Sequence, residues 1–178
     1  GDFSINSSSG VLTFASTPNY ESPADDGTNN EYIVIVTVTD SGGNTDTQTI
    51  TVTVTDVNEF TPVITSNGGG STGSISFAEN STSAVTTVTS SDVDAGATAA
   101  YSISGTDAGD FNINSSSGAL TFKSAPNFEI PIDADGNNAY IVDVIVTDNG
   151  SLTDTQTLTI TVTNVDDVDP VITSNGGG

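Results

Sequence analysis

The feature that most constrains the fold of this chain is an internal repeat. Residues 1–70 align without a gap to residues 109–178, and 47 of the 70 aligned pairs are identical. The stretch "GDFSINSSSGVLTF" returns as "GDFNINSSSGALTF", and both copies end in "PVITSNGGG". An offset of 108 residues is close to the commonest domain size. The repeat therefore predicts a tandem array of whole domains rather than a solenoid of short units.

The alignment also predicts where the domains begin and end. Residues 71–108 have no earlier counterpart, so we expect residues 1–58 to be an incomplete repeat that holds the last four strands only. Residues 59–70 are predicted to be a linker and lead-in, 71–167 a complete repeat, and 168–178 the start of a third. Half a sandwich exposes its inner face, so residues 1–58 should be marginally stable alone. Because the first residue is Gly1, we expect the chain to be a piece of a longer protein.

Strict alternation of apolar and polar residues predicts the secondary structure. In "EYIVIVTVTD" the side chains of Tyr32, Val34, Val36 and Val38 share one face, and "YIVDVIVTD" repeats the pattern from Tyr140. Shorter strands fit "SISF", "AYSIS", "DFNIN" and "ALTF", with turn residues between them. About seven strands per repeat predict an all-β fold: tandem seven-stranded antiparallel Greek-key β-sandwiches of the immunoglobulin-like kind, the first one incomplete.

Charge and composition exclude several classes of function. The chain has 23 acidic residues against one base, Lys123, and a net charge of −22. Nucleic acid and anionic membranes both need a basic surface, so neither is an expected partner. The absence of Cys and His removes the usual ligands of zinc, copper and haem. Hard oxygen donors remain, and these suit calcium or magnesium. The sequence has no run of about 18 apolar residues that could span a membrane.

Acidic residues recur where predicted strands end. Glu79 follows one strand in "FAENST", Asp92 and Asp94 follow the next in "SSDVDAG", and Asp148 ends the long strand in "VTDNG". Strand ends gather at the two poles of a sandwich, so these carboxylates should meet there. Two carboxylates about 4 Å apart repel by about 4 kcal/mol at an effective dielectric constant of about 20. A calcium ion, which accepts six to eight oxygens, would relieve that repulsion.

The order of the motifs "AEN", "DVD", "NFE", "TD" and "DVNEFTP" resembles the cadherin repeat, and in particular the bacterial cadherin-like repeats of large secreted adhesins. The resemblance implies calcium at the junction between two repeats. Its ligands there would be Asn19, Glu21, Asp56, the Val57 carbonyl, Asn58, Glu59, the Phe60 carbonyl, Asp92, Asp94 and Asp148. The other end of the second repeat would offer Glu79, Asn127, Glu129, Asn164, Asp166 and Asp167 to a further domain. Asn19 and Asn127 stand where the family usually has Asp, which implies weaker binding.

Three functions stay open at this point. The first is a calcium-dependent extender repeat of a secreted or cell-surface adhesin, whose partners are calcium, neighbouring repeats and homophilic or glycan contacts. The second is a glycan-binding or adhesive module of a secreted polysaccharide-degrading protein, and the third is a metal-free immunoglobulin-like spacer. Catalysis is not expected, because the chain has no His or Cys to serve as base or nucleophile. The acidic stretches "PADDGTNN" and "PIDADGNN" are interpreted as ordinary turns.

Overall fold

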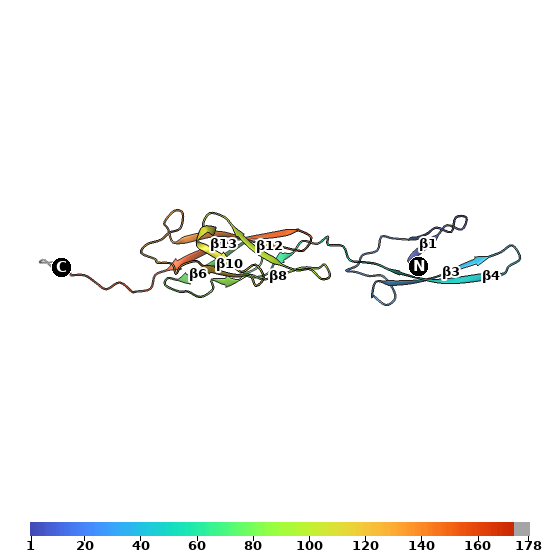
Figure 1. Ribbon diagram of the computed structural model, residues 1–178, viewed down its shortest axis with the longest axis horizontal. Coiled ribbons are helices and arrows are strands. Elements are labelled where there is room, and N and C mark those ends of the chain that lie inside the picture. Colours follow the sequence, from blue (N-terminus) through green and yellow to red (C-terminus); the bar gives the residue numbers. More distant parts are fainter. Residues whose placement is uncertain (173–178) are drawn as a thin grey trace. The chain divides into compact units, whose positions relative to one another are not determined.

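The computed structural model describes residues 1–172, which form two compact units (Figure 1). Unit 1 consists of residues 1–59 together with residues 93–96. Unit 2 consists of residues 60–92 and of the chain from residue 97 onward. The predicted start of a third repeat, 168–178, lies partly outside the described residues. Each unit is described by itself below.

Unit 2 is a β-sandwich with one three-residue helical turn, η1 (Ala108–Asp110). Its larger sheet has four strands in the order β6-β13-β12-β9, and a second sheet has three in the order β10-β11-β7. A short pair, β5-β8, completes the unit. The strands are β5 (Val63–Ile64), β6 (Thr72–Ala78), β7 (Thr86–Thr87), β8 (Ser90–Ser91), β9 (Ala100–Ser104), β10 (Phe111–Ile113), β11 (Ala119–Phe122), β12 (Ala139–Thr147) and β13 (Thr153–Thr163).

The core of unit 2 follows the alternation that the sequence displays. Val142, Val144 and Val146 on β12 are fully buried, as are Leu158 and Ile160 on β13. On β13, threonines occupy the positions between these apolar residues. Aromatic rings close the core, where Phe122 lies 4.3 Å from Phe111 and 5.1 Å from Tyr140 between ring centroids. Burial of one face of each strand against the other sheet is what selects this register.

The lead-in to unit 2 contributes one strand to the short β5-β8 pair and another to the larger sheet. β5 pairs antiparallel with β8, whereas β6 pairs in parallel with β13. Between them Asn67, Gly68, Gly69 and Gly70 all have positive φ, which glycine adopts without strain, and this lets the chain cross from one sheet to the other. The fully buried Gln156 holds the crossing, because its amide donates to the Ser66 and Gly70 carbonyls.

Two details differ from the expectation of seven uniform antiparallel strands. Val63–Ile64 forms a strand within the segment predicted as a linker, and β6 makes a parallel pair. The stretch "AVTTVTSS", in which two valines are out of phase, forms two short strands, β7 and β8, on different sheets. The buried Val88 lies between them and donates its amide to the Gly118 carbonyl, so the change of phase marks a break in the strand.

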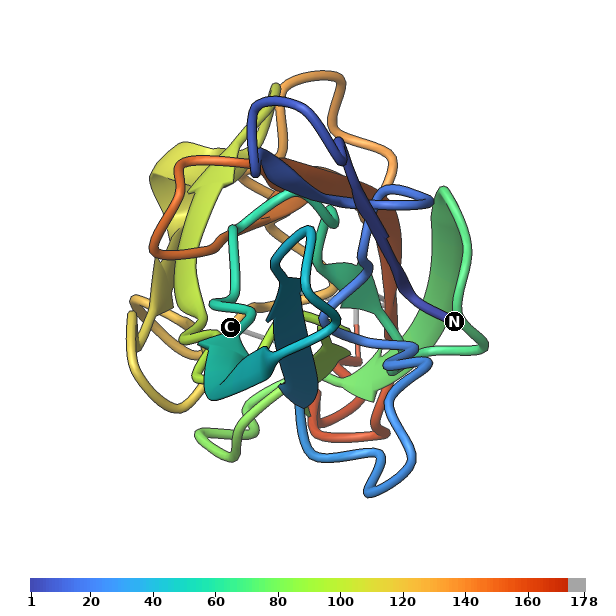
Figure 2. The ribbon, with the colours of Figure 1, turned by 90° about the vertical axis from the view of Figure 1, so that its right-hand side faces the viewer.

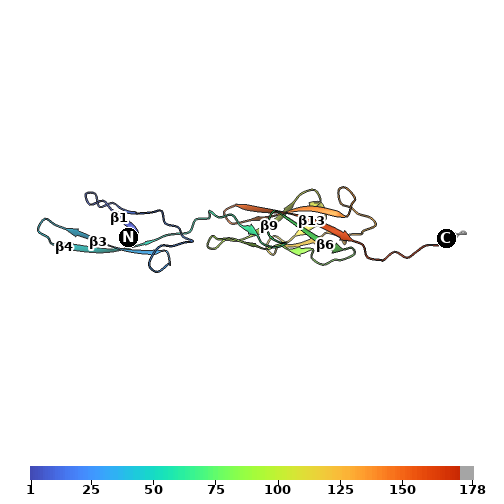
Figure 3. The ribbon, with the colours of Figure 1, turned by 180° about the vertical axis from the view of Figure 1, so that it is seen from behind.

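Unit 1 contains two hairpins: β1 (Phe3–Ile5) with β2 (Leu12–Phe14), and β3 (Glu31–Thr39) with β4 (Thr45–Thr53). The β1–β2 hairpin lies over the β3–β4 hairpin (Figure 3), and both pairs of strands are twisted, as the end-on view shows (Figure 2). Phe14 and Tyr32 pack edge to face with ring centroids 5.1 Å apart. Phe3 also packs on both rings. Beyond these three aromatic residues the core is open: Val36 is half-buried, and Val38 is 65 % exposed.

Candidate metal centre

Unit 1 gathers carboxylates beyond the end of its long hairpin. Glu21 lies in the loop before β3, and Asp56 and Glu59 follow the end of β4. Glu21, Glu59 and Asp94 each offer a carboxylate oxygen, and these three oxygens lie within 4.8 Å of one another. Both oxygens of Glu21 and one of Asp56 are buried, and none of them accepts a hydrogen bond within the described residues. Buried carboxylate oxygens without donors are costly unless a cation neutralises them.

The electrostatics of Glu21 agree with this arrangement. Burial raises the pKa of the Glu21 carboxyl above its ordinary value of 4.5, and the adjacent carboxyls of Asp56 and Glu59 raise it further. The one effect in the other direction comes from the nearby backbone amide of Glu21 itself, which is not in hydrogen-bond geometry with the carboxylate. The carboxylate form is therefore disfavoured in unit 1 taken alone, and a bound cation would restore it.

Unit 2 has a comparable group at the end where β6 and β13 finish and β12 begins. Glu79, Glu129 and Asp167 offer carboxylate oxygens that lie within 4.8 Å of one another. Glu79 directly follows β6 and is buried. Its two oxygens accept hydrogen bonds from the amides of Phe128 at 2.8 Å and Val165 at 2.7 Å. These hydrogen bonds tie the loop that carries Glu129 to the segment that carries Asp167.

The hydrogen bonds of Glu79 also set its protonation. They hold the pKa of the Glu79 carboxyl below its ordinary value of 4.5, the Val165 amide most strongly and the Phe128 amide next. Two amides complete this group: Asn80 Nδ2 donates to Asp167 at 2.6 Å, and Asn164 Nδ2 donates to Glu129 at 2.9 Å. The group is thus pre-organised around a carboxylate that stays ionised.

The opposite end of unit 2 carries Asp92 after β8 and Asp148 after β12. Each offers an oxygen within 4.8 Å of the other. Asp148 is buried, and its Oδ1 accepts the amides of Gly150 and Leu152, both at 2.8 Å. Acidic residues therefore occupy both ends of the sandwich, as the position of the motifs at strand ends predicts.

The remaining predicted ligands have varied surroundings. Asn19 and Asn127 occupy matching positions in the two repeats, and each caps a turn: Asn19 Oδ1 accepts the Ser22 amide and Asn127 Oδ1 the Ile130 amide, both at 2.8 Å. Asn58 is half-buried, and Phe60 is 36 % exposed. Val57 is exposed, and so is Asp166, which lies outside the group that contains Asp167.

Two residues with structural roles were not identified from the sequence. Asn80 fixes the Asp167 carboxylate, and only its place beside Glu79 in "AEN" could have indicated this. Asp107 is buried, and its carboxylate accepts the Ala134 amide at 2.8 Å and the Ile141 amide at 2.6 Å. Asp107 belongs to the stretch that has no counterpart in the first repeat, so comparison of the two repeats could not indicate that Asp107 has a structural role.

The donor set suits a hard divalent cation. Lys123, the one basic side chain, donates to the Gly109 carbonyl and is not among the residues of these groups. Carboxylate, amide and carbonyl oxygens are the ligands that calcium prefers.

None of the helical structure among the described residues has the length and apolarity of a membrane span.

The two-layered sandwich with acidic residues at both ends defines a structural class, the immunoglobulin-like β-sandwich module. The Cadherin domain profile matches residues 73–163, which is more than half of the chain. The chain therefore belongs to the cadherin family. Cadherin domains are adhesion modules and not enzymes, so the chain is not an enzyme. No curated protein sequence matches the chain.

Solved cadherin structures share the fold. A protocadherin gammaB7 EC3-6 cis-dimer structure has a TM-score of 0.71 at 24 % identity and covers 98 % of this chain. Drosophila N-cadherin EC1-4 has a TM-score of 0.72 at 24 % identity over 92 % of the chain. Human CDH23 EC21-23 has a TM-score of 0.74 at 21 % identity over 96 % of the chain. The chain spans 41 %, 38 % and 53 % of these structures, respectively.

Proposed function

We propose that this chain is a calcium-dependent extender segment of a large extracellular adhesin of the bacterial type. Calcium bound at the junction of consecutive repeats would join them into a stiff rod that carries an adhesive domain away from the surface. The observation that carries the proposal is Glu21, whose two oxygens are buried without hydrogen-bond donors beside Asp56 and Glu59. A divalent cation is the simplest partner that satisfies them, because the chain has a single base and that base is engaged elsewhere.

We propose two sets of ligands. The junction set consists of Asn19, Glu21, Asp56, the Val57 carbonyl, Asn58, Glu59, the Phe60 carbonyl, Asp92, Asp94 and Asp148. The second set would bind calcium at the junction with the next repeat. It consists of Glu79, Asn127, Glu129, Asn164, Asp166 and Asp167. When bound, calcium supplies positive charge that lets these carboxylates lie together. Glu79 positions the second set through its hydrogen bonds to Phe128 and Val165.

The domain limits remain part of the proposal: an incomplete repeat at 1–58, a linker and lead-in at 59–70, a complete repeat at 71–167 and the start of a third at 168–178. The linker would act in two ways. Its first residues carry ligands, and Val63–Ile64 anchors it by pairing with β8. The Ile64 amide also donates to Asp154 at 2.8 Å, which secures the lead-in to β13.

The glycan-binding alternative needs an exposed aromatic platform. Among the described residues, Phe60 alone of the eleven aromatic side chains is exposed, and most of the others pack in the cores. Stacking on sugars requires accessible ring faces. This distribution favours the extender over the glycan-binding module.

Calorimetric titration of the 178-residue chain with calcium tests the proposal. We expect saturable binding that magnesium reproduces weakly, because magnesium demands octahedral geometry and retains its water. Glu21→Gln should weaken binding at the junction, whereas Glu31→Gln, which alters an exposed residue outside the acidic groups, should leave it unchanged. Equal calcium affinity in the chain and in Glu21→Gln would remove the basis of the proposed junction. X-ray scattering with calcium and with chelator then tests stiffening separately.

A further inference from the structure

The turn between β12 and β13 of unit 2 places an asparagine directly before a glycine. Asn149 and Gly150 are both exposed. In such a pair the backbone nitrogen of the glycine can attack the side-chain amide of the asparagine, because glycine has no β-carbon to block the close approach. In a folded chain the hydrogen bonds that hold the two amides decide whether the attack takes place.

The hydrogen bonds of Asn149 leave its side-chain amide open to reaction. Its Oδ1 accepts the backbone amide of Thr98, 51 positions away in the sequence, at 3.2 Å. A donor at this oxygen stabilises the negative charge that the oxygen gains when a nucleophile attacks Cγ. The Nδ2 atom, which departs in the reaction, makes no hydrogen bond within residues 1–172.

The attacking amide is held by one hydrogen bond at the surface. Gly150 N donates to Asp148 Oδ1 at 2.8 Å, and the Leu152 amide donates to the same oxygen at 2.8 Å. The Asp148 amide also donates to the Leu152 carbonyl at 3.0 Å. The turn therefore stays closed when Gly150 rotates away from Asp148 toward the side chain of Asn149.

The other Asn-Gly pair among the described residues has different surroundings. Asn67 is half-buried in the crossing between β5 and β6. Its Oδ1 accepts the Thr86 hydroxyl at 2.9 Å, and its Nδ2 donates to Gln156 Oε1 at 3.3 Å. Reaction at Asn67 must first break this network around a fully buried glutamine. A third pair, at residues 175 and 176, lies outside the described residues.

From this contrast we propose that Asn149 is a self-modifying site of the folded chain. The bond between Gly150 N and Asn149 Cγ forms, and the bond between Cγ and Nδ2 breaks, which leaves a cyclic imide. The proton of Gly150 N passes to solvent, solvent returns a proton to the departing nitrogen, and ammonia leaves. Water then opens the imide at either carbonyl, so that position 149 becomes an aspartate or an isoaspartate.

Both products alter one end of unit 2. The new carboxylate lies next to Asp148, which already shares this end with Asp92, since the two offer oxygens within 4.8 Å of each other. Without a cation, the added charge increases the repulsion there. The isoaspartate also adds a carbon to the main chain within the turn that closes the β12–β13 hairpin. Modified chains should therefore be less stable in unit 2.

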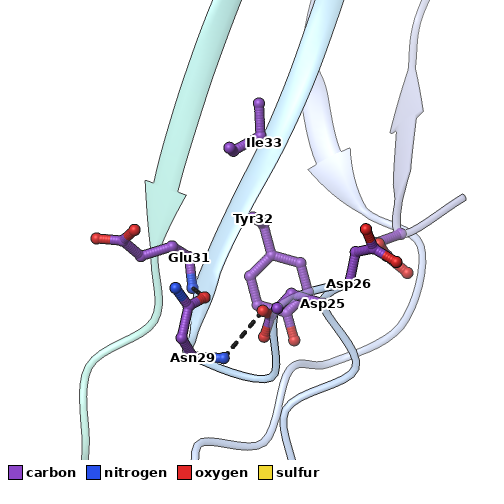
Figure 4. Close-up of a pocket in the computed structure, with 8 residues that line it drawn as sticks. Asp25, Asp26, Asn29, Glu31, Tyr32 and Ile33 are labelled. Carbon is purple, nitrogen blue, oxygen red and sulfur yellow. Dashed lines mark hydrogen bonds between the residues drawn. The ribbon is translucent and has the colours of Figure 1, made fainter.

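Two Asp-Gly pairs, at Asp26 and Asp135, can form the same kind of ring. Asp26 lies in the loop before β3, where the neighbouring Asp25 accepts the Asn29 amide at 3.0 Å (Figure 4). Ring closure at an aspartate releases water, and ring opening takes water up again, so the mass does not change. A measurement of mass therefore reports on the asparagines alone.

Incubation of the unaltered 178-residue chain at neutral pH, followed by peptide mapping with mass spectrometry, tests the proposal. Exchange of an amide for a carboxyl raises the mass of the modified residue. We expect Asn149 to convert at least about tenfold faster than Asn67, because Asn67 must first lose the hydrogen bonds of both side-chain atoms. Equal rates would overturn the proposal. So would an Asn149 that stays intact while a synthetic peptide of residues 145–153, "IVTDNGSLT", converts.

Two variants locate the chemistry. Asn149→Ser should abolish the change of mass at this turn and should fold, because the Ser-Gly turn of the first repeat likewise holds the Gly42 and Asn44 amides on Asp40 Oδ1. Gly150→Ala should slow conversion, and an unchanged rate would contradict attack by this nitrogen. If Gly150→Ala fails to fold, the comparison of Asn149 with Asn67 in the unaltered chain still decides the matter.

The effect on unit 2 is measured by melting fresh and incubated chains in chelator. The incubated chain should melt at a lower temperature than the fresh chain, whereas incubation should not change the melting of Asn149→Ser. Equal loss of stability in the two chains would contradict the effect assigned to position 149.

Discussion

Replacing one leucine in each repeat by alanine tests the contrast between the closed core of unit 2 and the open core of unit 1. Leu120 and Leu12 occupy the same place in the two repeats, on β11 and β2. Leu120 is fully buried, and Leu→Ala at such sites costs about 2.7–5 kcal/mol, since a cavity remains. Leu12 is half-buried and already lines an open pocket. Leu12→Ala should therefore lower the free energy of unfolding by no more than about 1–2 kcal/mol. Only part of the hydrophobic burial of this side chain is lost, and no enclosed cavity forms.

Native-state hydrogen exchange measures both effects in the same chain, because peptides from β11–β13 report on unit 2 and peptides from β1–β4 on unit 1. Leu120→Ala should lower the free energy of opening of unit 2 alone. Circular dichroism checks that both variants keep their strand content. Equal losses at the two positions would refute the reasoning, because they would mean that unit 1 closes its core to the same extent as unit 2.

The remaining predictions concern polar groups. Glu79→Gln should lower the melting temperature of unit 2 by several degrees even in chelator, because a Gln amide cannot accept the amides of both Phe128 and Val165; an unchanged midpoint would contradict this role. Asp107→Asn should destabilise unit 2 by about 1.5–3 kcal/mol in urea unfolding, whereas the exposed Asp169→Asn should change it by less than about 0.5 kcal/mol. Calcium affinity should fall as pH approaches 5, because protons compete for Glu21, whose pKa lies above 4.5; calorimetry at pH 5 and 7 checks this.

The same pKa shifts give opposite dependences of stability on pH when calcium is removed. The raised pKa of Glu21 contributes stability to unit 1 that is fully present below pH 4.5 and is lost as pH rises through the folded-state pKa. The lowered pKa of Glu79 contributes stability to unit 2 that is present above pH 4.5 and is lost as pH falls through its folded-state pKa.

The strands and their buried faces could be predicted from the sequence because alternation with a period of two leaves few other folds. Val142, Val144 and Val146 are buried as the pattern requires. The placement of acidic residues at strand ends could also be predicted from the sequence, since Asp148 directly follows β12 and Glu79 directly follows β6.

Other features depend on contacts between residues distant in sequence. The parallel pair of β6 with β13 rests on the crossing at residues 66–70, which the buried Gln156 holds from about 90 positions away. Asp107 looks like an ordinary turn residue in "GTDAGD", and only its hydrogen bond to the Ile141 amide reveals its role. Gln156 is in phase with the buried Leu158 and Ile160 on β13, so alternation could predict its burial but not the carbonyls that it contacts. Asp107 lies outside the alternating strands, so alternation could not identify it.

The most direct test of calcium as the ion that holds the junction is the melting of unit 1 with calcium and with chelator, followed by hydrogen exchange at residues 19–59. Calcium at about 100 times its dissociation constant should add about 2.7 kcal/mol per site and should protect the amides around Glu21 and Asp56. Identical exchange in calcium and in chelator would mean that these buried carboxylates coexist without a cation, and would contradict the account.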